Sequence, residues 1–191
     1  MQDVPTVMLV ALMFVSIVSM SIVTIISSLA TMIVQSSKMK RDSLHTSWLI
    51  YLLIAHLALF WSTLDIGVIA DWQFGEFLLV ILGPILAFFA VNTIVPGAAE
   101  DPTGSLREHY FRAARKFFGI FAWVKGWGLA MEWMLGHGWT AFSWINALMF
   151  LVMISMAYSR ATKLHIAGTI IAWVALLASL ILRGAYQISP N

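Results

Sequence analysis

Apolar residues gather along the chain into six long stretches, and most charged residues fall between them. A helix needs about 20 mainly apolar residues to cross the hydrocarbon core of a bilayer, because each residue adds about 1.5 Å. Each stretch is long enough for one crossing. The pattern predicts membrane-spanning helices at about 6–34, 47–70, 75–96, 114–135, 140–159 and 165–187.

The connections between these stretches predict how the helices fold back on one another. Residues 70–75 and 136–139 are very short turns, which force the flanking spans into antiparallel hairpins. The longest connection begins at Pro96 and predicts a surface turn, followed by an interfacial helix over 106–116 that leads into the fourth span. The expected fold is an all-α membrane helix bundle, with residues 1–191 as a single transmembrane domain.

Composition narrows the classes of function. Hydrophobic residues make up 61% of the 191-residue chain and charged residues 10%, whereas soluble globular domains carry about 25% charged residues. The chain has no cysteine, which excludes a disulfide framework and a thiolate metal site. Because the basic residues lie mostly at the ends of the spans, the pattern predicts contact with membrane lipids and no nucleic-acid partner.

The basic residues also predict the orientation of the chain. Cytoplasmic loops of membrane proteins are enriched in Lys and Arg, and nine of the eleven such residues fall on one side of the predicted spans. We expect that side to be cytoplasmic and both termini to be periplasmic. The nine residues are Lys38, Lys40, Arg41, Arg107, Arg112, Arg115, Lys116, Arg160 and Lys163.

The first predicted span is rich in hydroxyl side chains, and Thr24, Ser28 and Thr31 share one of its faces. Small hydroxylated residues let membrane helices approach closely and hydrogen-bond across the contact. This pattern favours a packing helix. A hydroxyl-lined permeation path is the alternative.

Several ionisable residues lie within the spans or near their ends, where a charge left in lipid costs several kcal/mol. Counting about 1.5 Å per residue from the cytoplasmic end separates them into two layers, one about 14–16 Å deep and one about 27 Å deep. The inner layer holds His56 and Lys125. The outer layer holds Asp65, Glu132 and Arg183, with Asn146 at its lower edge.

Helical spacing relates some of these residues to one another. Lys125 and Glu132 are seven residues apart, so they share a face of the fourth span. Nine residues place His56 and Asp65 on opposite faces of the second span. The outer layer is an externally accessible binding or proton-relay site, a structural ion-pair cluster, or a set of side chains that reach interfacial water. The sequence leaves these three interpretations open.

The sequence favours neither a cofactor nor a metal. Bis-histidine haem requires a second mid-membrane histidine, and the single mid-span lysine lies in the fourth span, which does not favour retinal. Three other histidines begin spans two, four and six, where convergence would suit a transition metal. Their spacing matches no local metal motif, which favours interfacial histidines without a ligand role. These three are His45, His109 and His165.

Basic and aromatic residues alternate over 106–118, and this segment predicts binding to anionic lipid headgroups, with each basic residue contributing about 1 kcal/mol. Docking of a partner protein is the alternative. The four basic positions are Arg107, Arg112, Arg115 and Lys116.

Several short motifs stand out between residues 47 and 120: Trp61-Ser-Thr-Leu-Asp65, Asp71-Trp-Gln-Phe74, Gly83-Pro84, Leu106-Arg-Glu-His-Tyr-Phe111 and Phe117-Phe118. This part of the chain resembles an uncharacterised group of small multi-pass bacterial inner-membrane proteins. The resemblance implies bacterial origin and an inner-membrane location, without a site.

No nucleophile elbow, phosphate-binding loop or dinucleotide fingerprint occurs in the chain, so nothing in it argues for an enzyme. Two function classes remain. The chain is a small transporter or channel with a polar site facing an internal cavity, or a non-catalytic accessory or assembly subunit of a larger membrane complex. We expect a homo-oligomer or a complex subunit in either case.

Overall fold

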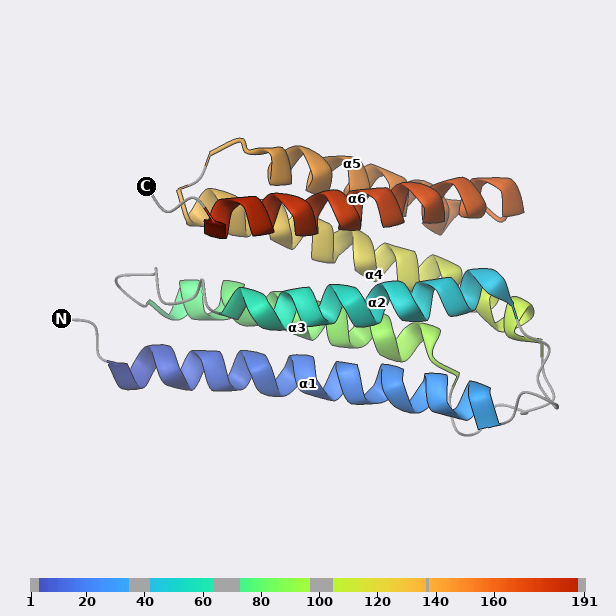
Figure 1. Cartoon of the computed structure of the whole chain (residues 1–191), viewed down its shortest axis with the longest axis horizontal. Coiled ribbons are helices and arrows are strands. Elements are labelled where there is room, and N and C mark those ends of the chain that lie inside the picture. Colours follow the sequence, from blue (N-terminus) through green and yellow to red (C-terminus); the bar gives the residue numbers. More distant parts are fainter. Residues whose placement is uncertain (1–3, 35–41, 64–72, 97–104, 137, 189–191) are drawn as a thin grey trace.

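The computed structural model is all-α and describes residues 4–34, 42–63, 73–96, 105–136 and 138–188. Its helices lie side by side and alternate in direction, so α1 begins and α6 ends at the same end of the bundle (Figure 1). In chain order they are α1 (Val4–Val34), α2 (Ser43–Trp61), α3 (Phe74–Ile94), α4 (Leu106–Met134), α5 (Ala141–Tyr158) and α6 (Thr162–Ile188).

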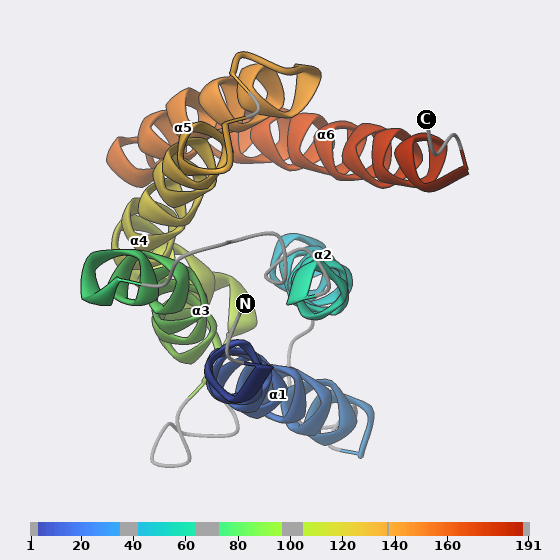
Figure 2. The same cartoon turned by 90° about the vertical axis from the view of Figure 1, so that its left-hand side faces the viewer.

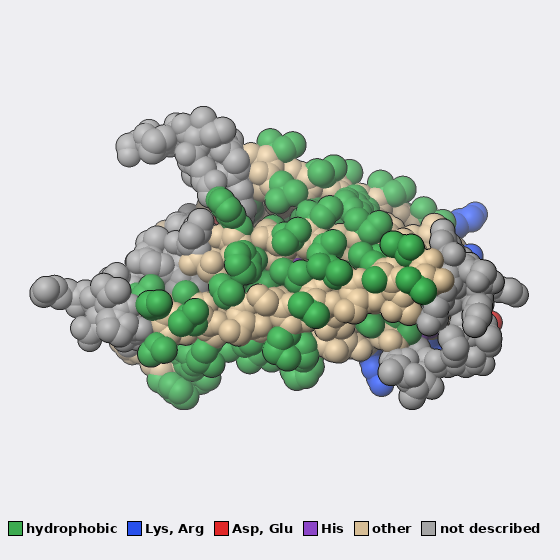
Figure 3. Space-filling view, turned by 60° about the horizontal axis from the view of Figure 1, so that its bottom comes forward, with side chains coloured by type: hydrophobic (Ala, Val, Ile, Leu, Met, Phe, Trp, Pro, Cys, Tyr) green, Lys and Arg blue, Asp and Glu red, His purple; other side chains and the backbone are tan. Residues whose placement is uncertain are grey.

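Five of these helices are long and apolar enough to cross a membrane: α1, α2, α3, α5 and α6. The fourth helix differs because it carries Lys125 and Glu132 in its second half and a basic segment in its first half. Large apolar side chains cover the outside of the bundle, while Lys and Arg gather toward one end (Figure 3). This is the surface of a helical membrane protein.

Seen along the helices, α1, α3, α4, α5 and α6 follow a curve, and α2 lies in the opening between α1 and α6 (Figure 2). From this position α2 contacts α1, α4 and α6. Glycines allow close approach where helices pair. Gly126 on α4 faces the Phe150 ring on α5, and Gly168 on α6 faces Met156. All six described helices contribute residues to one shared interior space.

Helix α2 differs from the predicted span over 47–70 at both of its ends. Helix α2 begins at Ser43 instead of 47, because the Asp42 carboxylate accepts hydrogen bonds from the backbone N–H groups of Leu44 (2.8 Å) and His45 (3.0 Å). It ends at Trp61, and residues 64–70 of the predicted span lie outside the described residues.

The segment predicted as an interfacial helix over 106–116 forms the first three turns of an uninterrupted α4. One of its faces is buried in the protein through Leu106, Tyr110 and Ala114. The prediction of a separate surface helix is therefore wrong. Residues 106–134 form one long helix, and its beginning packs within the bundle.

Four hydroxyl groups of α1, those of Ser16, Ser21, Thr24 and Thr31, bond to carbonyls of their own helix. Ser21 donates to the carbonyl of Ile17 (3.3 Å), and Thr24 donates to that of Met20 (2.9 Å). Side chains bonded in this way are satisfied without water or a neighbouring helix. The packing and permeation interpretations of this helix both stay predictions.

Candidate functional site: a polar cavity between the helices

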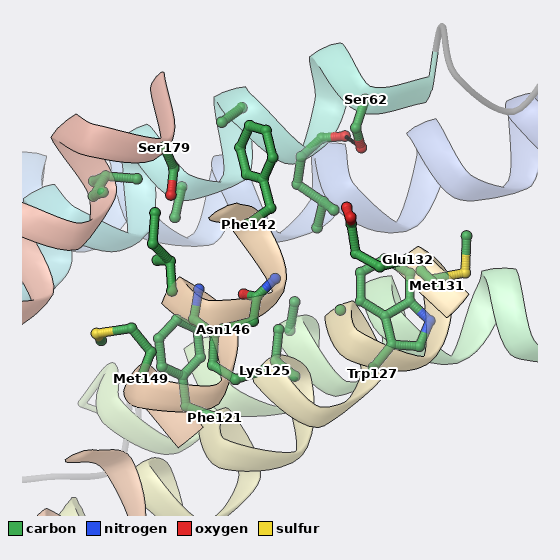
Figure 4. Close-up of a pocket in the computed structure, with 18 of the residues that line it drawn as sticks. Ser62, Phe121, Lys125, Trp127, Met131, Glu132, Phe142, Asn146, Met149 and Ser179 are labelled. Atoms are coloured by element: carbon green, nitrogen blue, oxygen red, sulfur yellow. Dashed lines mark hydrogen bonds between the residues drawn. The ribbon is translucent and has the colours of Figure 1, made fainter. Parts of the chain in front are cut away.

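A cavity of about 250 Å³ lies between the helices and takes lining residues from α1 to α6. It occupies the half of the bundle in which α2 and α4 end and α3 and α5 begin (Figure 4). Most of the lining is apolar. Polar side chains that line it are Tyr51, His56, Ser62, Lys125, Glu132, Asn146 and Ser179.

The Lys125 side chain extends from α4 into this cavity. Its ammonium nitrogen lies 5.4 Å from the centroid of the Phe121 ring, one turn earlier on the same helix. This is a cation–π contact, which holds the amine without neutralising it. Among the described residues, no carboxylate is within ion-pair distance of the Lys125 amine.

Asn146 extends from α5 toward the same space (Figure 4). A Cβ atom at Gly128 on α4 would lie only 3.1 Å from the Asn146 Nδ2 atom and 3.3 Å from its Cγ atom. The absence of a side chain at Gly128 thus lets the Asn146 amide lie against the backbone of α4, three residues after Lys125.

Glu132 lines the cavity nearer the end of α4. Its carboxylate oxygen Oε2 accepts a hydrogen bond from the Thr140 hydroxyl (2.9 Å). Thr140 is the N-cap of α5 and forms a capping box with Ser143. The carboxylate is therefore tied to the beginning of the next helix.

His56 is buried on α2 and also lines the cavity. Its Nδ1–H group donates to the Leu52 carbonyl (2.7 Å), which leaves Nε2 as the acceptor of a neutral ring. Within the described part of the chain, Nε2 has no hydrogen-bond partner. Because Nε2 is itself buried, His56 forms part of the cavity wall.

One wall of the cavity depends on Trp127. Its indole lies flat against Gly83 on α3, where any Cβ atom would overlap the ring, and its Nε1–H donates to the Leu79 carbonyl (2.6 Å). Pro84 follows directly and removes one backbone hydrogen bond from α3. Sequence reasoning missed this contact, because a Gly-Pro pair gives no indication of which aromatic ring will face it.

Four of the six predicted polar-site residues thus line one cavity: His56, Lys125, Glu132 and Asn146. Asp65 lies outside the described residues. Arg183 falls within α6, beyond the last described side chain. Lys125 and Glu132 share a face of α4, as their spacing predicts.

The three remaining histidines lie at the opposite end of the bundle and bond to protein groups. His45 and His109 each donate from Nε2 to the Ile94 carbonyl, at 3.0 and 2.9 Å. His165 bonds through Nδ1 to the Tyr110 hydroxyl (2.9 Å) and through Nε2 to the Ser159 carbonyl (2.9 Å). In the described ranges, no group of three or more metal-ligating side chains is placed to hold an ion.

The four basic residues of the first half of α4 are exposed at this same end. Arg107 donates to the Thr162 hydroxyl (3.1 Å), which connects α4 to α6, and Arg115 lies over the Tyr158 ring. Arg112 and Lys116 are the other two. The cavity end instead exposes aromatic rings of the kind found at membrane interfaces: Trp61, Phe74, Trp133, Trp139 and Trp144.

No protein-family model, curated protein or solved structure matches this chain. The chemistry of the cavity is therefore the guide to function. Hydroxyl, amide, imidazole, ammonium and carboxylate groups projecting from an apolar wall are suited to binding a small molecule.

Proposed function

We propose that this protein is a six-span transporter of the bacterial inner membrane that binds a small solute in the cavity between its helices. The observation that carries the proposal is that Lys125, Glu132, Asn146 and His56 all line one space. Ionisable side chains are costly in a membrane interior and commonly mark a solute or ion pathway. Two of them, Lys125 and Glu132, lie on α4, the least apolar helix, which would cross the membrane beside five apolar neighbours.

The orientation belongs to the same proposal. The basic residues Arg107, Arg115 and Lys116 lie at the end opposite the exposed rings of Trp133 and Trp139. The positive-inside rule places the basic end in the cytoplasm. The cavity then lies in the periplasmic half, and both termini are periplasmic.

The orientation is testable because the natural chain contains no cysteine. We expect Met39→Cys and Phe74→Cys to react with a membrane-impermeant maleimide from opposite faces of the membrane. Phe74→Cys should react in intact spheroplasts, and Met39→Cys only in inverted vesicles. Reaction of both cysteines from the same face would contradict the six-span topology.

Water access to the cavity tests the transport proposal. We expect Ser179→Cys, whose position lines the cavity, to react with an impermeant thiol reagent from the periplasmic side. The matched control is Leu177→Cys on the same helix, where the native side chain is 53% exposed on the outside of the bundle. Only a thiolate reacts, and a thiol facing lipid stays protonated, so we expect the control to react about tenfold or more slowly. Equal rates would contradict a water-accessible cavity.

Purification in mild detergent separates this proposal from the accessory-subunit alternative. A transporter is expected as a monomer or homo-oligomer of this chain. A discrete assembly with other subunits would favour the accessory role and would contradict the proposal of an independent transporter.

A further inference from the structure

The charge of the cavity suggests the chemistry of its ligand. Lys125 is the one Lys or Arg among the described lining residues, and its amine contacts the Phe121 ring without a carboxylate partner. Glu132 lies seven residues further along α4, a rise of about 10 Å, and its carboxylate is bound by Thr140. A cation removed from bulk water is stabilised by a nearby anion. Because no described carboxylate is within ion-pair distance of the Lys125 amine, a bound anionic ligand can supply that negative charge.

Asn146 adds a neutral donor to the cavity that holds the Lys125 amine. Its amide lies against Gly128, and Figure 4 shows its side chain and that of Lys125 directed into the same space from α5 and α4. Within the described chain, the Asn146 amide has no hydrogen-bond partner. An ammonium group and an amide N–H group together match the two oxygens of a carboxylate.

The remaining lining favours an apolar body of small size. Aliphatic and aromatic side chains form most of the lining, including Leu59, Met149 and Leu176. The 250 Å³ volume exceeds the roughly 150 Å³ of an apolar cavity that holds one benzene molecule. That space suits a compact acid with a short aliphatic chain or one ring.

We propose that the cavity binds small apolar monocarboxylates, with Lys125 and Asn146 holding the carboxylate and the apolar wall holding the rest of the molecule. This inference rests on the proposed function, because it names the class of solute for the same cavity.

Benzoate and its uncharged analogue benzamide test the assignment, because they differ little in shape and differ in charge. We expect the full-length protein in lipid nanodiscs at pH 7 to bind benzoate about tenfold or more tightly than benzamide, measured by calorimetric titration. One factor of ten corresponds to about 1.4 kcal/mol. Equal binding of the two compounds, or no binding of benzoate, would overturn the proposal.

Variants assign the effect to the named residues. Lys125→Met should weaken benzoate binding about tenfold or more, and Asn146→Leu by a smaller factor, with benzamide binding little changed. Lys116→Met is the matched control, since this exposed lysine lies at the basic end of the same helix, and it should bind benzoate like the natural protein. Unchanged benzoate binding by a folded Lys125→Met variant would overturn the assignment. If that variant fails to fold, the benzoate-to-benzamide ratio of the natural protein decides.

Failure of this inference is distinguishable from failure of the proposed function. If Ser179→Cys reacts from the periplasm and benzoate does not bind, the water-accessible cavity stands and the monocarboxylate class is wrong. If Ser179→Cys and Leu177→Cys react equally slowly, the proposed function itself is contradicted.

Discussion

Replacing Trp48 by alanine is expected to lower the free energy of unfolding by about 3–5 kcal/mol, the usual cost of removing a large buried aromatic side chain. Trp48 is fully buried, and its ring centroid lies 4.9 Å from that of Tyr51 and 5.0 Å from that of Phe118. Its Nε1–H donates to the Thr169 hydroxyl (2.9 Å), which links α2 to α6. Inside a bilayer, such packing and hydrogen bonding supply the stability that water exclusion supplies in soluble proteins.

The measurement is an SDS titration in mixed micelles, with the folded fraction followed by circular dichroism. Trp48→Phe should fall between the natural protein and Trp48→Ala, because it keeps a ring and loses the hydrogen bond. Trp123→Ala is the control, since that side chain is 67% exposed on the outside of the bundle, and its effect should stay within about 0.5 kcal/mol. Equal losses for Trp48→Ala and Trp123→Ala would contradict the described core.

The second large effect is expected at Gly83. A methyl group at this position would overlap the Trp127 indole, so the ring must move and weaken its hydrogen bond to the Leu79 carbonyl. We expect Gly83→Ala to lower the free energy of unfolding by about 1–3 kcal/mol, the range for overpacking a tight contact. Because Trp127 lines the cavity, the same variant should also weaken ligand binding there.

Gly119→Ala provides the matched control in a neighbouring helix. Nothing lies within 4 Å of a Cβ atom at this position, and alanine favours a helix over glycine by about 1 kcal/mol. The same SDS titration should therefore give unchanged or increased stability. If Gly83→Ala were as stable as Gly119→Ala, that result would contradict the described contact between Gly83 on α3 and Trp127 on α4.

These two sites bear on the cavity in different ways. Trp48 joins α2 to the rings of α4, including Phe121, whose face the Lys125 amine contacts. Trp127 forms a wall between α3 and α4. A loss of ligand binding in either variant would therefore follow from a disturbed scaffold, whereas Lys125→Met removes the charge alone.

The sequence by itself determined the helical class and much of the placement of polar residues along each helix. A bilayer requires every backbone hydrogen bond to be made within the segment, so long apolar stretches with charged ends leave few alternatives to helices. The helical repeat then fixes which residues share a face, as it does for Lys125 and Glu132. Helix formation and the face on which a residue lies both depend on residues that are close to one another in the sequence, so the sequence alone can predict them.

Only the tertiary structure decided which faces meet. The Asn146 amide lies against the backbone of α4 because Gly128 leaves room between α4 and α5, and His45 and His109 both donate to the Ile94 carbonyl. Such contacts depend on the rotation and depth of one helix relative to another, which are set by the packing of many side chains at once. Helical periodicity within a single chain carries no information on that rotation, so the cavity emerges only when all the helices are assembled.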